Sequence, residues 1–98
     1  MTMVAENRPM STGTADSGAS DHIGALRNRI DEIDNALIEL WQERARISGE
    51  VGRVRIASGG TRLVLSRERE IVDRFRAALG PDGTQIALMI LRAGRGPL

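Results

Sequence analysis

The sequence predicts an all-α protein: a three-helix protomer with one long N-terminal helix, paired with a second copy in an intertwined homodimer. Three observations support this prediction. Apolar residues recur in alternating steps of three and four over a long stretch of the chain. Two shorter helical segments follow, and glycines bound them. Neither a strand pattern nor an internal repeat is present in the sequence.

The first helix is expected over residues 23–57. Ser20 or Asp21 can cap its start with a side-chain oxygen, and Gly59-Gly60 ends it. Its recurring positions form one continuous stripe, which we call the seam. The seam consists of Ile23, Leu26, Ile30, Ile33, Leu37, Leu40, Arg44, Ile47, Val51 and Val54.

Two shorter helices are expected after the long one. The second covers residues 66–79, with Ser66 as N-cap and Gly80 as stop, and the third covers residues 84–93 after a turn at residues 80–83. The first helix is roughly 50 Å long at ~1.5 Å per residue. Since two short helices cannot cover both its ends, we expect a partner chain to bury the seam. The alternative is a monomeric bundle with a kinked or split first helix.

Length and composition limit the domain organisation and the chemistry. The 98 residues suit one helical domain, expected over residues 21–98, after a disordered N-terminal tail over residues 1–20. Cysteine is absent and His22 is the one histidine. These counts exclude disulfides and thiolate chemistry, and they argue against a zinc site or a Ser-His-Asp triad. We therefore expect no metal and no cofactor.

Hydropathy predicts a location away from membranes. No stretch approaches the ~18 consecutive apolar residues of a membrane-spanning helix. The N-terminus also lacks the apolar core of a signal peptide. We therefore expect a cytoplasmic protein.

All 14 basic residues are arginines, and the net charge is only +1. A GC-rich genome explains such a bias, but arginine also suits bidentate binding of carboxylates or phosphates. Residues 21–43 hold two arginines and six acids, whereas residues 44–76 hold nine arginines and four acids. The basic half could enclose a small anionic ligand or form a solvated face, and the low net charge argues against nucleic-acid binding.

Arg44 is the clearest candidate for a functional residue, because every other seam position is apolar. It could form a buried structural ion pair, extend its guanidinium to solvent, or bind an anionic ligand in a water-poor pocket. Arg55 lies 11 residues on and returns to nearly the same face of the helix. Arg27 lies 17 residues before Arg44, roughly 25 Å along the helix, so it could approach only the Arg44 of an antiparallel partner.

A glycine-containing loop leads into the second helix, and Arg67 and Glu68 fall in the first turn of that helix. Glu68 suits the positive end of the helix dipole, and the free N–H groups there could also receive a ligand oxygen. No phosphate-binding or dinucleotide-binding motif is present.

These segments, taken in order, resemble the all-helical chorismate mutases, in particular the short actinobacterial (delta) subclass. The resemblance covers about residues 23–98. It rests on Leu26-Arg27, Glu43-Arg44, Val51-Gly52-Arg53-Val54-Arg55, the loop Ser58-Gly59-Gly60-Thr61-Arg62-Leu63-Val64, Ser66-Arg67-Glu68-Arg69, and Leu91-Arg92-Ala93-Gly94-Arg95-Gly96.

The resemblance implies an intertwined dimer with two active sites. In each site, Arg27 of one subunit and Arg44 of the other would bind substrate carboxylates, and Arg55 would face the ether oxygen. Arg67 would support the ligand near the loop, and Glu68 would take the ring hydroxyl. Val64 stands where enteric relatives carry a carboxylate near that hydroxyl, although the short subclass tends to be apolar there. No role follows for Arg95.

The implied activity is an isomerisation, the pericyclic rearrangement of the dicarboxylate chorismate to prephenate in phenylalanine and tyrosine biosynthesis. Such a reaction needs no nucleophile, metal or proton transfer, which agrees with the composition. Isochorismate-pyruvate lyases and 4-amino-4-deoxychorismate mutases share the fold and stay open as alternatives. Outside these enzymes, a non-catalytic helical dimer that binds a partner protein or RNA is a further alternative. The short subclass also implies DAHP synthase as an activating partner.

Overall fold

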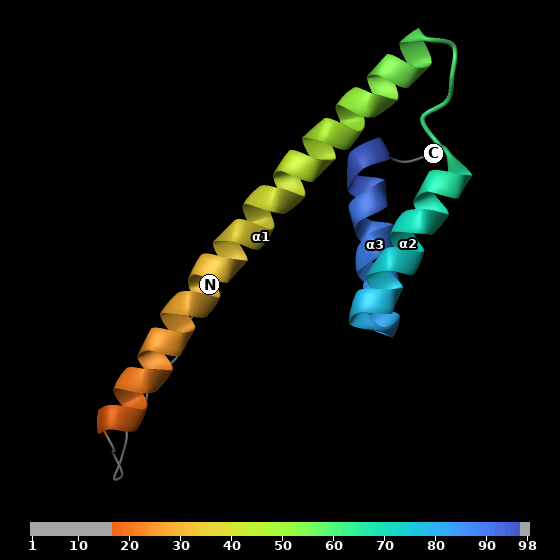
Figure 1. Ribbon diagram of the computed structural model, residues 1–98. Coiled ribbons are helices and arrows are strands. Elements are labelled where there is room, and N and C mark those ends of the chain that lie inside the picture. Colours follow the sequence, from red (N-terminus) through yellow and green to blue (C-terminus); the bar gives the residue numbers. More distant parts are fainter. Residues whose placement is uncertain (1–16, 97–98) are drawn as a thin grey trace. The chain divides into compact units, whose positions relative to one another are not determined.

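The structure is a computed structural model that describes residues 17–96, and these residues form three α-helices (Figure 1). The chain divides into two compact units, and the division falls within the first helix, after Ala36. The described part of the first unit is a single helical stretch, residues 17–36. The second unit, residues 37–98, contains the rest of that helix and the other two helices.

The long helix α1 spans Ser17–Ala57. Its end agrees with the predicted stop at Gly59-Gly60, but its start lies before the predicted residue 23, so Ser20 and Asp21 are helical residues rather than caps. Residues 17–20 contain no proline, and each residue added to an existing helix gains a backbone hydrogen bond. Residues 1–16 of the predicted tail lie outside the described part of the chain, and the division into tail and domain stays a prediction.

Helix α2 spans Leu65–Leu79, one residue longer than predicted. Val64 takes the N-cap position in an extended conformation, without a side-chain capping bond, so the prediction of Ser66 as N-cap is wrong. The Glu68 N–H donates to the Val64 carbonyl at 3.1 Å, and this bond closes the first turn. The start of α2 therefore depends on backbone bonding, and Glu68 lies in its first turn as predicted.

Helix α3 spans Pro81–Arg95, so the predicted turn at residues 80–83 is wrong. Gly80 alone separates α2 from α3, with a φ of 75° that a residue with a side chain rarely adopts. Pro81 is the first residue of α3, where its fixed φ and missing N–H suit a helix start. Because the reversal needs one residue, α2 and α3 run antiparallel and side by side (Figure 1).

The buried core is small and lies between α2 and α3. Its fully buried members within residues 17–96 are Ile71, Ala87 and Leu91, and the partly buried Val72 and Phe75 pack against them. By contrast, α1 has no buried residue among those described. The nine apolar seam side chains are between 42% and 61% exposed in the single chain. None of the three described helices is long and apolar enough to cross a membrane.

Candidate active site

A cavity of about 500 Å³ lies within the second unit, lined by the last part of α1, the loop after it, the start of α2 and the end of α3. Its lining is strongly cationic, with six arginines and one glutamate among the residues that the structure describes. The charged lining residues are Arg44, Arg53, Arg55, Arg62, Arg67, Glu68 and Arg95. Such a lining favours a small anionic ligand over a cationic or neutral one.

Arg44 is half-buried in this cavity, and its Nη1 atom is fully buried without a hydrogen-bond partner among residues 17–96. Burial lowers the pKa of its guanidinium, and the nearby cations Arg67 and Arg74 lower that pKa further. Arginine nevertheless stays protonated in proteins. No residue among 17–96 of the same chain forms an ion pair with Arg44. A guanidinium with one buried and unpaired nitrogen is suited to an anion from outside the chain.

Arg55 lines the same cavity, as the helical period predicted, and it is half-buried. The loop after α1 folds back on the backbone of Arg55. The N–H groups of Ser58 and Gly60 donate to the Arg55 carbonyl at 3.1 and 2.8 Å. Farther along the loop, the Thr61 hydroxyl donates to the Leu63 carbonyl at 2.7 Å. These local bonds fix the end of α1, and with it the root of the Arg55 side chain.

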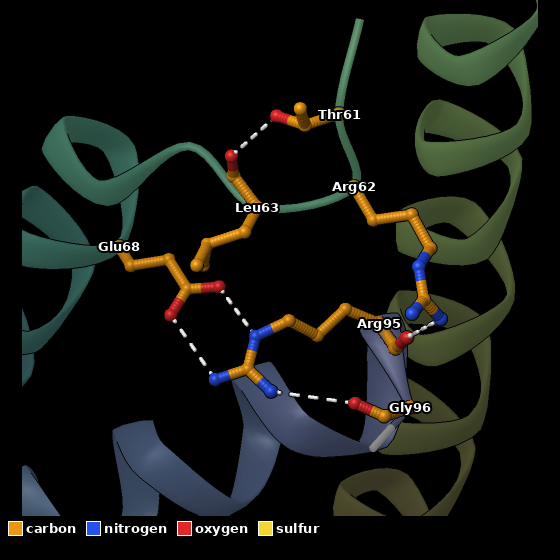
Figure 2. A network of polar contacts seen from close by, with 6 residues as sticks. All are labelled: Thr61, Arg62, Leu63, Glu68, Arg95 and Gly96. Carbon is orange, nitrogen blue, oxygen red and sulfur yellow. Dashed lines mark hydrogen bonds and ion pairs between the residues drawn. The ribbon is translucent and has the colours of Figure 1, made fainter. Parts of the chain in front are cut away.

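Glu68 and Arg95 form a bidentate ion pair across the cavity lining (Figure 2). Arg95 Nε donates to Glu68 Oε2 at 2.7 Å, and Arg95 Nη2 donates to Oε1 at 3.2 Å. Both side chains are only 19% exposed. The hydrogen bonds that Arg95 donates to Glu68 raise the pKa of Arg95, and the negative charge of Glu68 adds to this effect against the opposing effect of burial. The pair therefore joins the first turn of α2 to the last turn of α3.

Of the three remaining predicted site residues, two line the cavity and one does not. Arg67 and Val64 line the cavity, and Arg67 also contacts Glu70 at 3.4 Å in an exposed pair. Arg27 belongs to the first unit and is not among the lining residues. The second unit thus brings together Arg44, Arg55, Val64, Arg67 and Glu68, and the predicted role of Arg27 stays a prediction.

Three lining arginines were not predicted as site residues. Arg53 pairs with Glu50 at 2.7 Å on an exposed surface. Arg62 donates through Nη1 to the Arg95 carbonyl at 3.2 Å, which ties the loop to the end of α3 (Figure 2). Arg95 had no assigned role, although its place just before Gly96 in a helix-ending motif was visible in the sequence. Its partner Glu68 is 27 residues away, so no local pattern indicated the pair.

The end of α3 approaches α1 closely at one point. A Cβ atom added at Gly94 would collide with the Ser48 side chain, so glycine is the residue that allows this approach. Gly94 and Ser48 both line the cavity, and Arg95 follows Gly94 directly. The packing of these two residues therefore sets the position from which Arg95 reaches Glu68.

The fold and the cationic cavity agree with comparisons to known proteins. A family model for chorismate mutase type II matches residues 26–90. A protein named "Intracellular chorismate mutase" from Mycolicibacterium smegmatis is 48% identical over 80 residues, which cover 82% of this chain and 77% of the relative. Its namesake from Mycobacterium tuberculosis is 43% identical over 94 residues, covering 96% of this chain and 89% of the relative.

A solved structure is also similar. It is described as a non-covalent complex of DAHP synthase and chorismate mutase from Corynebacterium glutamicum with a bound transition state analog. Its TM-score is 0.77 at 38% sequence identity, and the match covers 82% of this chain and 96% of that chain. The likeness confirms the all-α, three-helix class that the sequence predicted.

The chain belongs to the chorismate mutase type II family, as the sequence resemblance implied. Its activity is that of a chorismate mutase, which is an isomerase.

Proposed function

We propose that the arginine-lined cavity is the active site, that it converts chorismate into prephenate, and that this step serves phenylalanine and tyrosine biosynthesis. The observation that carries the proposal is the buried Nη1 atom of Arg44, which has no acceptor among residues 17–96. A carboxylate of the substrate supplies this acceptor, because a guanidinium binds a carboxylate through two parallel hydrogen bonds.

The rearrangement needs charge stabilisation and orientation from the protein. One C–O bond breaks and one C–C bond forms within the same molecule, so no proton, nucleophile or metal takes part. Negative charge grows on the ether oxygen as its bond breaks, and a fixed cation at that oxygen stabilises the transition state more than the substrate. Arg55 takes this role, while Arg44 holds a carboxylate and fixes the reactive conformer. Both line the cavity, and the loop bonds fix the backbone of Arg55.

The start of α2 supplies the rest of the binding site. Glu68 accepts a hydrogen bond from the ring hydroxyl, Arg67 supports the ligand near the loop, and Val64 provides an apolar wall. The support for these roles is that all three residues line the same cavity as Arg44 and Arg55. A carboxylate beside the ring hydroxyl orients the ring without taking part in the chemistry.

The reaction is tested with purified protein and the substrates of the three candidate activities: chorismate, isochorismate and 4-amino-4-deoxychorismate. We expect chorismate absorbance to be lost and prephenate to be the sole product. Release of pyruvate from isochorismate with a higher kcat/KM would contradict the proposal in favour of a lyase. Faster conversion of the amino compound would contradict it in favour of the third activity.

Two chains together form the working unit in this proposal, an intertwined homodimer. The support is the nine apolar seam side chains of α1, each at least 42% exposed in the single chain, beside a core of three fully buried residues within 17–96. A second copy of α1 covers the seam by repeating the same heptad pattern. Sedimentation equilibrium at micromolar concentration should give twice the mass of one chain. A monomer under these conditions would contradict the homodimer and would favour the monomeric three-helix bundle.

Arg27 completes the site from the other chain in this dimer, where it binds the second substrate carboxylate. The support is the position of Arg27 early in α1, the helix that carries the exposed seam. Arg27 does not line the cavity that the second unit of the same chain forms. An antiparallel pairing of two α1 helices brings the early part of one beside the late part of the other. The two carboxylates of the substrate then have one arginine from each chain.

We propose that the homodimer also binds DAHP synthase. We propose the cytoplasm as the place where the two proteins meet. The support is the similar solved structure, in which a chorismate mutase forms a complex with DAHP synthase. The test is a mutase assay with and without DAHP synthase from the same organism. Binding of the synthase with a rise in kcat/KM is expected, and unchanged kinetics at a saturating synthase concentration would contradict the activation.

A further inference from the structure

The ion pair between Glu68 and Arg95 engages both groups within the chain (Figure 2). Each carboxylate oxygen of Glu68 accepts one bond from Arg95. On the arginine side, the third nitrogen, Nη1, donates to the Gly96 carbonyl at 3.3 Å. All three nitrogens of the guanidinium therefore have an acceptor within the chain.

This geometry distinguishes Arg95 from Arg44. The Arg44 guanidinium has a buried nitrogen without an acceptor among residues 17–96, whereas the Arg95 guanidinium is used by Glu68 and Gly96. The anion-binding capacity of Arg95 is thus directed at Glu68. Its effect on a ligand passes through the position and the charge of that carboxylate.

We propose that Arg95 is a positioning and specificity-determining residue, which holds Glu68 and offsets its charge so that the site accepts a ring hydroxyl and rejects a ring ammonium. This inference rests on the proposed function, in which Glu68 faces the ring hydroxyl of chorismate. It concerns the choice between chorismate and an analogue with an amino group at the same ring position.

The physical basis is the difference between a hydrogen-bond acceptor and a net negative charge. A carboxylate oxygen has more than one acceptor site, so each oxygen of Glu68 can take a neutral O–H donor in addition to its bond from Arg95. An ammonium gains most from an uncompensated anion, and Arg95 compensates this one. Five further arginines line the cavity and oppose a cationic group.

Replacing Arg95 changes these two effects in different directions. In Arg95→Met, Glu68 keeps its charge but loses two hydrogen bonds that fix its orientation. Chorismate should bind and react less well, because the acceptor for its hydroxyl is no longer held in place. The amino analogue should bind better relative to chorismate, because Glu68 now offers a free negative charge.

The experiment measures kcat and KM for chorismate, and the inhibition constant Ki of 4-amino-4-deoxychorismate in the same assay. For Arg95→Met we expect kcat/KM for chorismate to fall about tenfold or more. We expect the ratio of KM for chorismate to Ki for the amino analogue to rise by about tenfold. In Arg95→Lys the charge is retained, so the ratio should stay near the parent value while kcat/KM falls.

Two variants separate this role from a purely structural one. Arg92→Met makes the same change of charge on an exposed side chain of the same last turn of α3, and it should leave both quantities unchanged. Glu68→Gln removes the negative charge through which Arg95 acts. When Arg95→Met is added to Glu68→Gln, the ratio should not change further, as expected for two residues that act as one unit.

The inference is overturned if Arg95→Met weakens both ligands by the same factor, since loss of structure acts on both alike. It is also overturned if the ratio still shifts in the Glu68→Gln background. Failure of the proposed function gives a different result. Either the parent protein forms no prephenate from chorismate, or it forms prephenate with kinetics that Arg44→Ala leaves unchanged. An active parent with an unchanged ratio in Arg95→Met contradicts this inference alone.

Discussion

At the scale of single residues, Arg44 combines burial, positive charge and an unused donor. Its Nη1 atom is buried without an acceptor among residues 17–96, and the neighbouring cations Arg67 and Arg74 make its charge more costly to hold. A buried donor of a charged group that lacks an acceptor is unfavourable. A dicarboxylate ligand offsets this cost on binding, so the residue favours the anion-bound state.

Replacing Arg44 should therefore impair catalysis strongly. We expect Arg44→Ala to lower kcat/KM for chorismate by about a hundredfold or more, because a charge-assisted contact is lost in a site with little water. Steady-state kinetics with parent and variant measure the effect. The control is Arg46→Ala, which removes an exposed arginine two residues away on the same helix and should have little effect. A loss below about threefold for Arg44→Ala would return this residue to a structural role.

Arg55 should act on the chemical step rather than on binding. It faces the ether oxygen in the proposed complex, where negative charge grows only in the transition state. Arg55→Ala should thus lower kcat by about a hundredfold with a smaller change in KM. Arg27→Ala should mainly raise KM, because the substrate carboxylate has the same charge throughout the reaction. Equal effects of Arg55→Ala on kcat and 1/KM would contradict this division of roles.

Much of the site could be predicted from single residues and their spacing. The helical period placed Arg44 and Arg55 on one face of α1, and both line the cavity. The family motif placed Val64, Arg67 and Glu68 beside them. The pairing of Glu68 with Arg95 could not be predicted, because it depends on how the start of α2 and the end of α3 lie relative to each other in the folded chain.

At the scale of the helices, the existence and the C-terminal ends of the helices were predicted better than their starts. Heptad spacing and glycine stops placed all three helices, and the end of α1 and the end of α2 are confirmed at Ala57 and Leu79. The starts were wrong by one to six residues because several residues near each start can serve as a cap. At Pro81 the sequence suggested a turn, but a proline after Gly80 begins a helix instead.

The contact between α3 and α1 depends on Gly94. An added Cβ atom would collide with the Ser48 side chain, so Gly94→Ala should lower the free energy of unfolding by about 1–3 kcal/mol. It should also lower kcat/KM, because the end of α3 carries Arg95. Chemical denaturation at a fixed protein concentration measures the stability.

Two variants serve as controls for Gly94→Ala. Gly24→Ala adds the same methyl group in α1 where nothing lies within 4 Å, and it should be neutral or stabilise by about 0.5–1 kcal/mol. Adding Ser48→Gly to Gly94→Ala removes the colliding atoms and should restore part of the lost activity. If Gly94→Ala is as stable and active as the parent, the close approach of α3 to α1 is not needed.

At the scale of the whole molecule, the central claim is that two chains build each active site. The cavity of one chain supplies Arg44, Arg55, Arg67 and Glu68, and the proposed partner supplies Arg27. The exposed seam gives the physical reason for the pairing, since the apolar side chains of α1 need a surface to pack against. On this claim the two carboxylate-binding arginines of one site, Arg27 and Arg44, belong to different chains.

Subunit complementation tests this claim most directly. Arg27→Ala and Arg44→Ala proteins are mixed, and exchange of subunits is confirmed by native mass spectrometry. Activity is measured at a chorismate concentration well below the KM of Arg27→Ala, where each variant is nearly inactive alone. A heterodimer then has one site with both arginines and one site with neither. Activity per heterodimer should recover to about half that of the parent dimer. If the subunits exchange and activity stays at the background of the two separate variants, Arg27 does not act across the dimer and the shared site is wrong.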